Sequence, residues 1–379
     1  MMKRLLTFLL ICLVSWCVSA IEPGGFLSIE ELAKQAEAVN VSSSSPKKTK
    51  LPYEVIFFFD ISARDSAAYL AMLADLQRTL AELPQQNQAE FFLLSRGSRS
   101  AVKKFVMQTE TALPVYVDSK RSLFKEYAAG ELLLPFALIV KDGKVLWKGS
   151  PIDLDNIMNL MRTGKFTPDI QLKVARLRKE MQMAVQASLP DVILRCANEI
   201  LKLQPGDSLA IQAKLFVFEN SKRFPAALAF TRENAKANPQ DVKQTLLYLN
   251  YLQRGGNRNQ FMKAFDDAVK QFNKSPESLF RLLAFAASDT VPFSWMPLET
   301  VKNLPDQIRD FFGKQPADRR CAFHQYEAAI RYGLCNINAA VQAQKQAYTF
   351  ATGRKKADAR RQLEFYQNIQ RLQQGKNGK

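Results

Sequence analysis

The stretch "LLPFALIVKDGKVLWKGSP", residues 133–151, decides the fold class of this chain. Residues 136–140 and 145–148 are short apolar runs, and the Asp142-Gly143 pair between them favours a tight turn. The stretch therefore predicts an antiparallel hairpin that is opened by Pro135 and followed by a glycine after its second strand.

Upstream of this hairpin, strands and helices alternate from residue 51 onward. Residues 55–59 (VIFFF) and 89–95 (AEFFLLS) are continuous apolar runs, as is typical of strands that are covered on both faces. Residues 66–83 predict an amphipathic helix, because four leucines recur at helical spacing: Leu70, Leu73, Leu76 and Leu80. Shorter segments predict a helix at 100–107, a strand at 113–118, and helices at 123–127 and 152–161.

The resulting order, β-α-β-α-β-α-β-β-α, resembles the thioredoxin fold, in the branch of the bacterial TlpA-like and peroxiredoxin-like proteins. The resemblance covers about residues 51–165 and rests on residues 133–151 and on the strand, elbow and helix of residues 55–70. It implies an α/β domain in which the bond between Leu134 and Pro135 is cis, a geometry largely confined to proline.

The redox motif of that family, two cysteines separated by two residues, falls on Ala63, Arg64, Asp65 and Ser66, where both cysteines are missing. Dithiol exchange needs one thiolate that attacks and a second thiol that resolves the mixed disulfide. Ala63 cannot attack, and the pKa of a serine hydroxyl such as that of Ser66 lies far above that of a thiol. We therefore expect a pseudoenzyme without catalytic residues at this position.

Two interpretations of the elbow, residues 60–66, remain open. Ser62 or Asp65 can cap the following helix, so that the elbow is only a connection. Alternatively, Arg64 with Ser62 can hold an anionic group or an extended peptide at the positive end of the helix, with Pro135 nearby.

From residue 166 the pattern predicts helices only, to about residue 372, followed by a basic tail at 373–379. Pro205 and Pro239 lie 34 residues apart and frame two predicted helices, near 208–220 and 224–237. This segment resembles a degenerate tetratricopeptide repeat, which implies a surface that binds a protein or peptide. Pro276 indicates a third, irregular repeat, whereas the proline-rich residues 288–312 predict an irregular segment.

The N-terminus has the pattern of a secretory signal at residues 1–20, with Lys3 and Arg4 before an apolar run at 5–14. An uncleaved membrane anchor is the alternative, although the run is short for a bilayer. Residues 21–50 predict a flexible tether, and no later segment predicts a transmembrane helix. Export to the bacterial periplasm is the expected localisation.

Three cysteines follow the signal, at Cys196, Cys321 and Cys335, and all three are expected to be buried small hydrophobic residues. Whether Cys321 and Cys335 form a disulfide is left open. His324 is the only histidine and is expected to pack or to lie on the surface. We expect no metal site and no cofactor.

The chain is basic, with a net charge of +17 that falls to +15 once Lys3 and Arg4 leave with the signal. No base-reading or zinc motif accompanies this charge, so nucleic acid is not an expected partner. The expected function is protein–protein interaction, as a scaffold or in chaperone-like handling of exported chains. Two alternatives are a thiol-disulfide oxidoreductase that uses a non-standard cysteine, and a binder of anionic envelope polymers. The sequence leaves the oligomeric state open.

Overall fold

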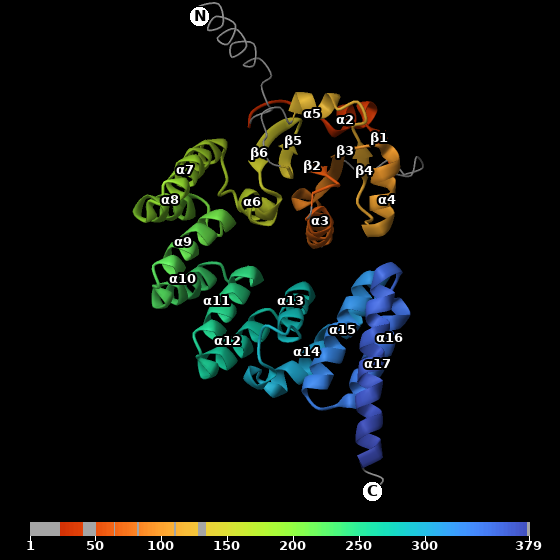
Figure 1. Ribbon diagram of the computed structural model, residues 1–379. Helices are drawn as coiled ribbons and strands as arrows, with labels where there is room; N and C mark the ends of the chain where they lie inside the picture. Colours follow the sequence, from red (N-terminus) through yellow and green to blue (C-terminus); the bar gives the residue numbers. More distant parts are fainter. Residues whose placement is uncertain are drawn as a thin grey trace, which may run out of the picture. The chain divides into compact units, whose positions relative to one another are not determined.

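The computed structural model of this protein describes residues 23–40, 51–63, 65–81, 83–109, 111–127 and 134–376 (Figure 1). The chain divides into two compact units, one ending at Ala213 and the other starting at Lys214. The first unit contains the sheet and the second contains helices. The predicted fold class, a thioredoxin-like α/β domain followed by an all-helical part, is therefore confirmed.

The sheet of the first unit has six strands among the described residues, in the order β1-β4-β3-β2-β5-β6. Their bounds are β1 Glu37–Ala38, β2 Tyr53–Asp60, β3 Ala89–Arg96, β4 Val115–Val117, β5 Phe136–Lys141 and β6 Lys144–Gly149. The central strands β2, β3 and β4 are parallel, whereas β1, β5 and β6 run antiparallel to the strands they pair with.

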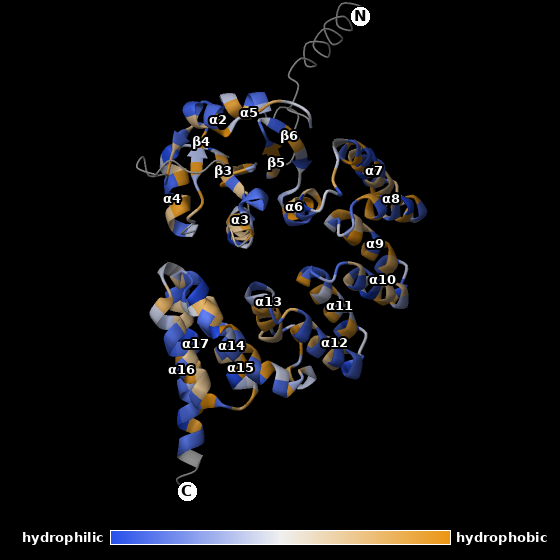
Figure 2. Ribbon diagram, turned by 180° about the vertical axis from the view of Figure 1, so that it is seen from behind, coloured by the Kyte–Doolittle hydropathy of each residue, from blue (hydrophilic) through white to orange (hydrophobic). Residues whose placement is uncertain are grey.

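Both faces of the central strands are covered, which explains the continuous apolar runs of the sequence (Figure 2). In β2, Phe57 and Phe59 point into one core together with the four predicted leucines of α3, Ser66–Ala81. The intervening Ile56 and Phe58 point into the core on the opposite face.

Helices cover each face of this sheet. On the first face lie α3, α4 (Arg99–Thr109) and α6 (Leu154–Arg162), and on the second lie α2 (Ile29–Gln35) and α5 (Ser122–Tyr127). Two 3₁₀ helices, η1 (Gln85–Asn87) and η2 (Pro151–Asp153), complete the connections. The predicted hairpin is β5–β6, and both residues of its turn, Asp142 and Gly143, have positive φ angles of 52° and 76°.

Residues 23–40 do not form the predicted tether. Leu27 and Leu32 are buried against the second face of the sheet. The backbone of residues 24–27 bonds to the β6 end of the sheet, where Leu27 donates to the carbonyl of Gly143 at 2.8 Å. Further along, β1 pairs with β4, and Asn40 donates to the carbonyl of Leu113 at 2.9 Å. Although its composition looks polar, this segment therefore pairs with β4 on one side of the sheet and with the start of β6 on the other. Residues 1–22 and 41–50, with the predicted signal, lie outside the described part.

The first compact unit extends past the predicted boundary at residue 165, since it includes α7 (Pro168–Gln186) and α8 (Pro190–Leu203). The amide of Gln171 in α7 donates to the carbonyl of Lys148 in β6 at 3.2 Å. Arg178, also in α7, reaches Asp153 of η2. These polar contacts attach the first helical hairpin to the α/β domain, and no composition change at residue 165 signals them.

Nine helices follow among the described residues, and those up to α13 start at a regular spacing. Their bounds are α9 Ser208–Asn220, α10 Phe224–Ala237, α11 Val242–Arg254, α12 Arg258–Gln271, α13 Pro276–Ala286, α14 Leu298–Gly313, α15 Ala317–Gly333, α16 Ile337–Phe350 and α17 Gly353–Lys376. Helices α9, α11 and α13 begin 34 residues apart, at residues 208, 242 and 276. Helices α8, α10 and α12 begin at residues 190, 224 and 258, again 34 apart. The predicted helix pairs are therefore present at the predicted period.

One turn geometry recurs between paired helices. A residue with positive φ stands two positions before the second helix in four pairs: Ser188, Lys222, Gly256 and Cys335, with φ of 55°, 55°, 72° and 58°. In each turn its N–H bonds to the carbonyl three residues earlier, which closes the first helix. This position explains why Cys335 is exposed, contrary to the expectation for all three cysteines.

One further expectation for the helical part is wrong. Residues 298–313 form the continuous helix α14 despite Pro305 in its interior. An interior proline costs roughly 3 kcal/mol, but four large apolar residues of α14 are buried on one face, and each contributes about 1.5–3 kcal/mol. They are Val301, Leu304, Ile308 and Phe312. The predicted basic tail is helical to Lys376, and residues 377–379 lie outside the described part.

None of the helices within the described ranges is both long and apolar enough to cross a bilayer.

Candidate functional site

The elbow after β2 lies at the carboxyl end of the parallel strands, where α/β sheets commonly place their ligands. The parallel register sets Asp60, the last residue of β2, beside Arg96, the last residue of β3. Arg96 Nε donates to Asp60 Oδ2 at 2.7 Å. The one carboxylate at the end of β2 is therefore already paired with a cation.

The other oxygen of Asp60 organises the turn itself. Both the backbone N–H and the hydroxyl of Ser62 donate to Asp60 Oδ1, at 2.8 Å and 2.6 Å. Burial would raise the pKa of Asp60, but the hydrogen bonds from Ser62 and Arg96 outweigh it and hold that pKa below its ordinary value. Ser62 was predicted to contact a ligand, but its hydroxyl donates a hydrogen bond within the turn. The residue is nevertheless exposed.

The residues at the positions of the missing cysteines form hydrogen bonds within the elbow. Ser66, the first residue of α3, is only 1% exposed, and its hydroxyl donates to the carbonyl of Asp60 at 2.5 Å. Ala63 is half-buried, its N–H bonds to the same carbonyl at 3.1 Å, and Asp65 is exposed. These bonds join the end of β2 to the start of α3. Arg64, the predicted anion contact, lies outside the described residues.

Pro135 adjoins this elbow, as the resemblance implied. The Leu134–Pro135 bond is cis. The antiparallel register pairs Phe58 with Phe136, which sets Pro135 alongside the carboxyl end of β2. The structure therefore brings Asp60, Ser66 and Pro135 to one corner of the sheet, with no thiol among the described residues of that corner.

The three thiols lie in helices or turns of the helical part and are not bonded to one another. Cys196 in α8 is 0% exposed and Cys321 in α15 is 1% exposed. Burial raises the pKa of both thiols, which leaves them in the unreactive protonated form near neutral pH. Cys335 is the exposed thiol of the three, in the turn before α16. The question of a Cys321–Cys335 disulfide is answered: both are free.

His324 packs, as expected, within a charged cluster of the second unit. Its Nδ1 lies 3.2 Å from Glu327 Oε2, and its ring stacks on Phe350. Arg309 binds the same carboxylate with both terminal nitrogens, at 3.1 Å and 2.6 Å. Burial would raise the pKa of Glu327, but these bonds and charges lower it to about 2. The cluster is a satisfied ion-pair network, and within the described ranges no group of three metal-ligating side chains occurs.

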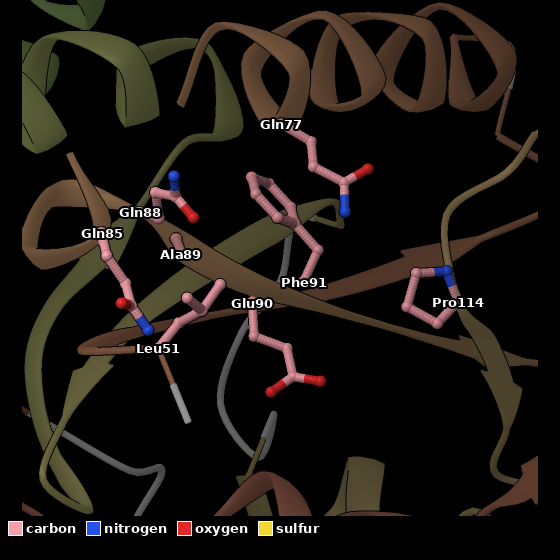
Figure 3. Close-up of a pocket in the computed structure, with 8 residues that line it drawn as sticks. All are labelled: Leu51, Gln77, Gln85, Gln88, Ala89, Glu90, Phe91 and Pro114. Carbon is pink, nitrogen blue, oxygen red and sulfur yellow. The ribbon is translucent and has the colours of Figure 1, made fainter. Parts of the chain in front are cut away.

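A second feature, an open hollow of about 470 Å³, lies at the opposite end of the sheet (Figure 3). It is lined by Leu51, Gln77, Gln85, Gln88, Ala89, Glu90, Phe91 and Pro114. Residues 89–91 begin β3, whereas the elbow follows the carboxyl end of β2. The described lining contains amides and one carboxylate but no thiol, histidine or basic group. It includes none of the predicted site residues.

Sequence reasoning missed the most buried charged group of the first unit. Arg178 Nη2 lies 2.7 Å from Asp153 Oδ2 and 2.5 Å from Asp207 Oδ2, and both carboxylates are almost fully buried. Asp207 also caps α9 by accepting from the N–H of Ala210 at 2.8 Å. The available signal was Asp207 itself, because an aspartate just before a predicted helix is a typical cap. The arginine that it binds stands 29 residues away.

No protein-family model matches the sequence, and no curated protein matches it. Among solved structures, a domain of a possible thiol-disulfide isomerase from Cytophaga hutchinsonii is similar at 10% identity and a TM-score of 0.29, covering 38% of this chain and 97% of that chain. A thiol-disulfide oxidoreductase from Bacteroides fragilis gives 15% identity and a TM-score of 0.29, covering 38% of this chain and 99% of that chain. A mutant of PrxQ from Xylella fastidiosa gives 14% identity and a TM-score of 0.31, covering 38% and 98%. Scores this low carry no argument about activity.

Proposed function

We propose that this protein is an exported, non-catalytic thioredoxin-like protein that acts by binding other proteins in the cell envelope, as a scaffold or in chaperone-like handling of exported chains. One observation carries the proposal. At the corner where the fold would exchange thiols, Ser66 is buried and bonded to the Asp60 carbonyl, and Ala63 offers no nucleophile.

The remaining polar groups of the corner support the same conclusion. Asp60 is paired with Arg96 and its pKa is lowered, so its carboxylate is a weak general base. Ser66 has no base among its hydrogen-bond partners, because its hydroxyl donates to a backbone carbonyl. A hydroxyl without a neighbouring base is a weak nucleophile near neutral pH.

The helical part supports the binding role. Helix starts repeat every 34 residues from α8 to α13, the period expected for a tetratricopeptide-like array. Neighbouring helices of such arrays stack into extended surfaces that commonly bind peptides or proteins. Export rests on the sequence of residues 1–20, with its basic start, apolar run and small residues at 18–20.

Insulin reduction by dithiothreitol tests the absence of dithiol chemistry. The purified protein is compared with a variant in which Cys196, Cys321 and Cys335 are all serine. We expect no acceleration by either protein. Acceleration by the wild type that vanishes in the variant would replace the proposal with the oxidoreductase alternative, and separate substitution of the exposed Cys335 would identify the thiol.

Capture from a native envelope extract, followed by mass spectrometry, tests the binding role. Proteins retained by the wild type in 0.15 M salt and also in 0.5 M salt support a specific interaction, since exposed charge contacts are largely screened at the higher salt. Retention of anionic polymers alone, lost at the higher salt, would favour the polymer-binding alternative.

A further inference from the structure

The last helix, α17, exposes large hydrophobic side chains to solvent. Phe365 is 44% exposed and Leu372 is 64% exposed, and Tyr332 at the end of α15 is 39% exposed. The ring of Tyr332 meets that of Phe365 edge-on, with centroids 5.7 Å apart. Residues 365 and 372 are two helical turns apart and share one face of α17. We call Tyr332, Phe365 and Leu372 the α17 patch.

This patch is not the face that holds α17 in the fold. Ala359 and Tyr366 are buried on another side of α17, and Leu363 and Ile369 pack against the core formed with α16. These core contacts hold α17 to α16, and the Tyr332 ring, which also meets Tyr366 at 5.2 Å, adds a contact to α15. The exposed side chains of Phe365 and Leu372 together form an apolar surface on α17, the kind of surface that commonly marks a protein contact.

Part of the patch lies on a segment of α17 that extends beyond its neighbour. Helix α17 has 24 residues and α16 has 14, a difference of about 15 Å at 1.5 Å per residue. Gln370 donates to Asn338, near the start of α16, at 2.6 Å. The turns after Gln370, including Leu372, project past α16 (Figure 1). A second helix can approach this end without displacing α16.

The charged residues of α17 are mostly basic. Helix α17 contains seven basic and two acidic residues. The two acidic residues are paired within the helix, Asp358 with Arg361 and Glu364 with Arg360, the latter at 2.8 Å. Basic residues of α17 therefore outnumber acidic residues by 7 − 2 = 5.

We propose that the α17 patch binds an amphipathic helix of a partner protein, with an apolar stripe flanked by acidic residues. Two apolar residues seven positions apart on α17 give the spacing of an apolar seam between two packed helices. The surplus positive charge of α17 complements acidic flanks and opposes a second copy of α17, which carries the same surplus. This inference rests on the proposed binding function and names one site and one partner class for it.

A designed peptide tests the proposal on the purified protein. The probe is a fluorescein-labelled 20-residue helix with leucine at every first and fourth heptad position and glutamate beside them; the charge-swapped probe carries lysine instead. Fluorescence anisotropy should show saturable binding of the glutamate peptide that weakens with salt, and at least tenfold weaker binding of the lysine peptide. This comparison depends on no protein variant.

Two substitutions test whether the glutamate peptide binds at the α17 patch. Leu372→Asp and Phe365→Ala should each weaken binding of the glutamate peptide roughly tenfold, the size expected for losing one buried anchor. The matched control is Met107→Asp on α4, a residue that is 69% exposed, which should leave binding unchanged. Circular dichroism confirms that each variant is folded.

Three results would overturn the proposal. The first is equal binding of both peptides, or binding that Leu372→Asp leaves intact. The second is preference for phosphatidylglycerol vesicles over the glutamate peptide, which would make the patch a membrane contact. The third is concentration-dependent self-association that Leu372→Asp abolishes, which would make a second copy the occupant. If envelope proteins are still captured by the Leu372→Asp variant, the proposed function stands while this site for it fails.

Discussion

Replacing Arg178 by methionine should destabilise the first unit more than any substitution of an exposed cation. Arg178 is the shared partner of two almost fully buried carboxylates, at 2.7 Å from Asp153 and 2.5 Å from Asp207. At these distances each contact has about 6 kcal/mol of gross attraction at an effective dielectric constant near 20. Most of this attraction offsets the cost of desolvating the buried charges. Removing the cation leaves both buried carboxylates without their partner. The expected loss in the free energy of unfolding is about 3–5 kcal/mol.

The loss should depend on pH with a defined sign. Burial raises the pKa of Asp153, and the charge of Asp207 raises it further, although Arg178 opposes both effects. Without Arg178 the pKa in the folded state rises further above its unfolded value of about 3.9. A raised pKa favours the folded state in acid, and this benefit is lost as pH rises through the folded value. The deficit of the variant should therefore be larger at pH 8 than at pH 5.

Urea unfolding measures this deficit. Trp147 is fully buried in the first unit, and substitution of Trp16 and Trp295 by phenylalanine leaves it as the only tryptophan reporter. The control is Arg176→Met, an exposed arginine on the same helix, which should change stability by less than about 0.5 kcal/mol. A loss under 1 kcal/mol for Arg178→Met at pH 8, or a larger loss at pH 5, would refute this reasoning.

Three further predictions concern other parts of the chain. Because the pKa of Glu327 is lowered to about 2 from 4.5, stability should fall as pH drops from about 4.5 toward 2, and Glu327→Gln should remove about 3 kcal/mol at pH 7 and flatten that acid loss in urea titrations. Cys335→Gly should stabilise the second unit by about 1 kcal/mol in thermal melts, since the residue has a φ of 58°, whereas Gly256→Ala should destabilise it by about as much; an unchanged melting temperature in both would contradict the shared turn. Leu32→Ala should lower the free energy of unfolding by about 2–5 kcal/mol in urea titrations, because this side chain is fully buried. A loss below about 0.5 kcal/mol would support the original interpretation of residues 21–50 as a flexible tether.

The sequence predicted those elements whose stability is local or follows from simple periodicity. The hairpin required Asp142-Gly143 at a turn that only positive φ angles close, and both angles are positive. The leucines of α3 and the runs of β2 and β3 were buried as their periods require. The 34-residue spacing of helix pairs was visible because each pair forms one repeating unit.

For the candidate site, the sequence supplied the residues and the structure supplied their partners. Ala63 and Ser66 could be identified as replacements of the redox cysteines from position alone. That Ser66 is buried and bonded to Asp60, and that Asp60 is paired with Arg96, depends on strand register. The periodicity of the sequence does not determine the register between two strands. It therefore cannot predict which two residues lie side by side at the strand ends.

Apart from Cys335, whose exposure follows from a local turn, the expectations that failed depended on contacts between distant segments. Composition made residues 21–50 look like a tether, but Leu27 and Leu32 are buried because the sheet offers them an apolar face. Pro305 looked like a break, yet the buried face of α14 outweighs one lost hydrogen bond. The sequence by itself determined the local elements and the absence of redox thiols at the elbow. Only the tertiary structure decided where the chain divides, since a buried charge such as Arg178 is stable only where folding brings both of its carboxylates to it.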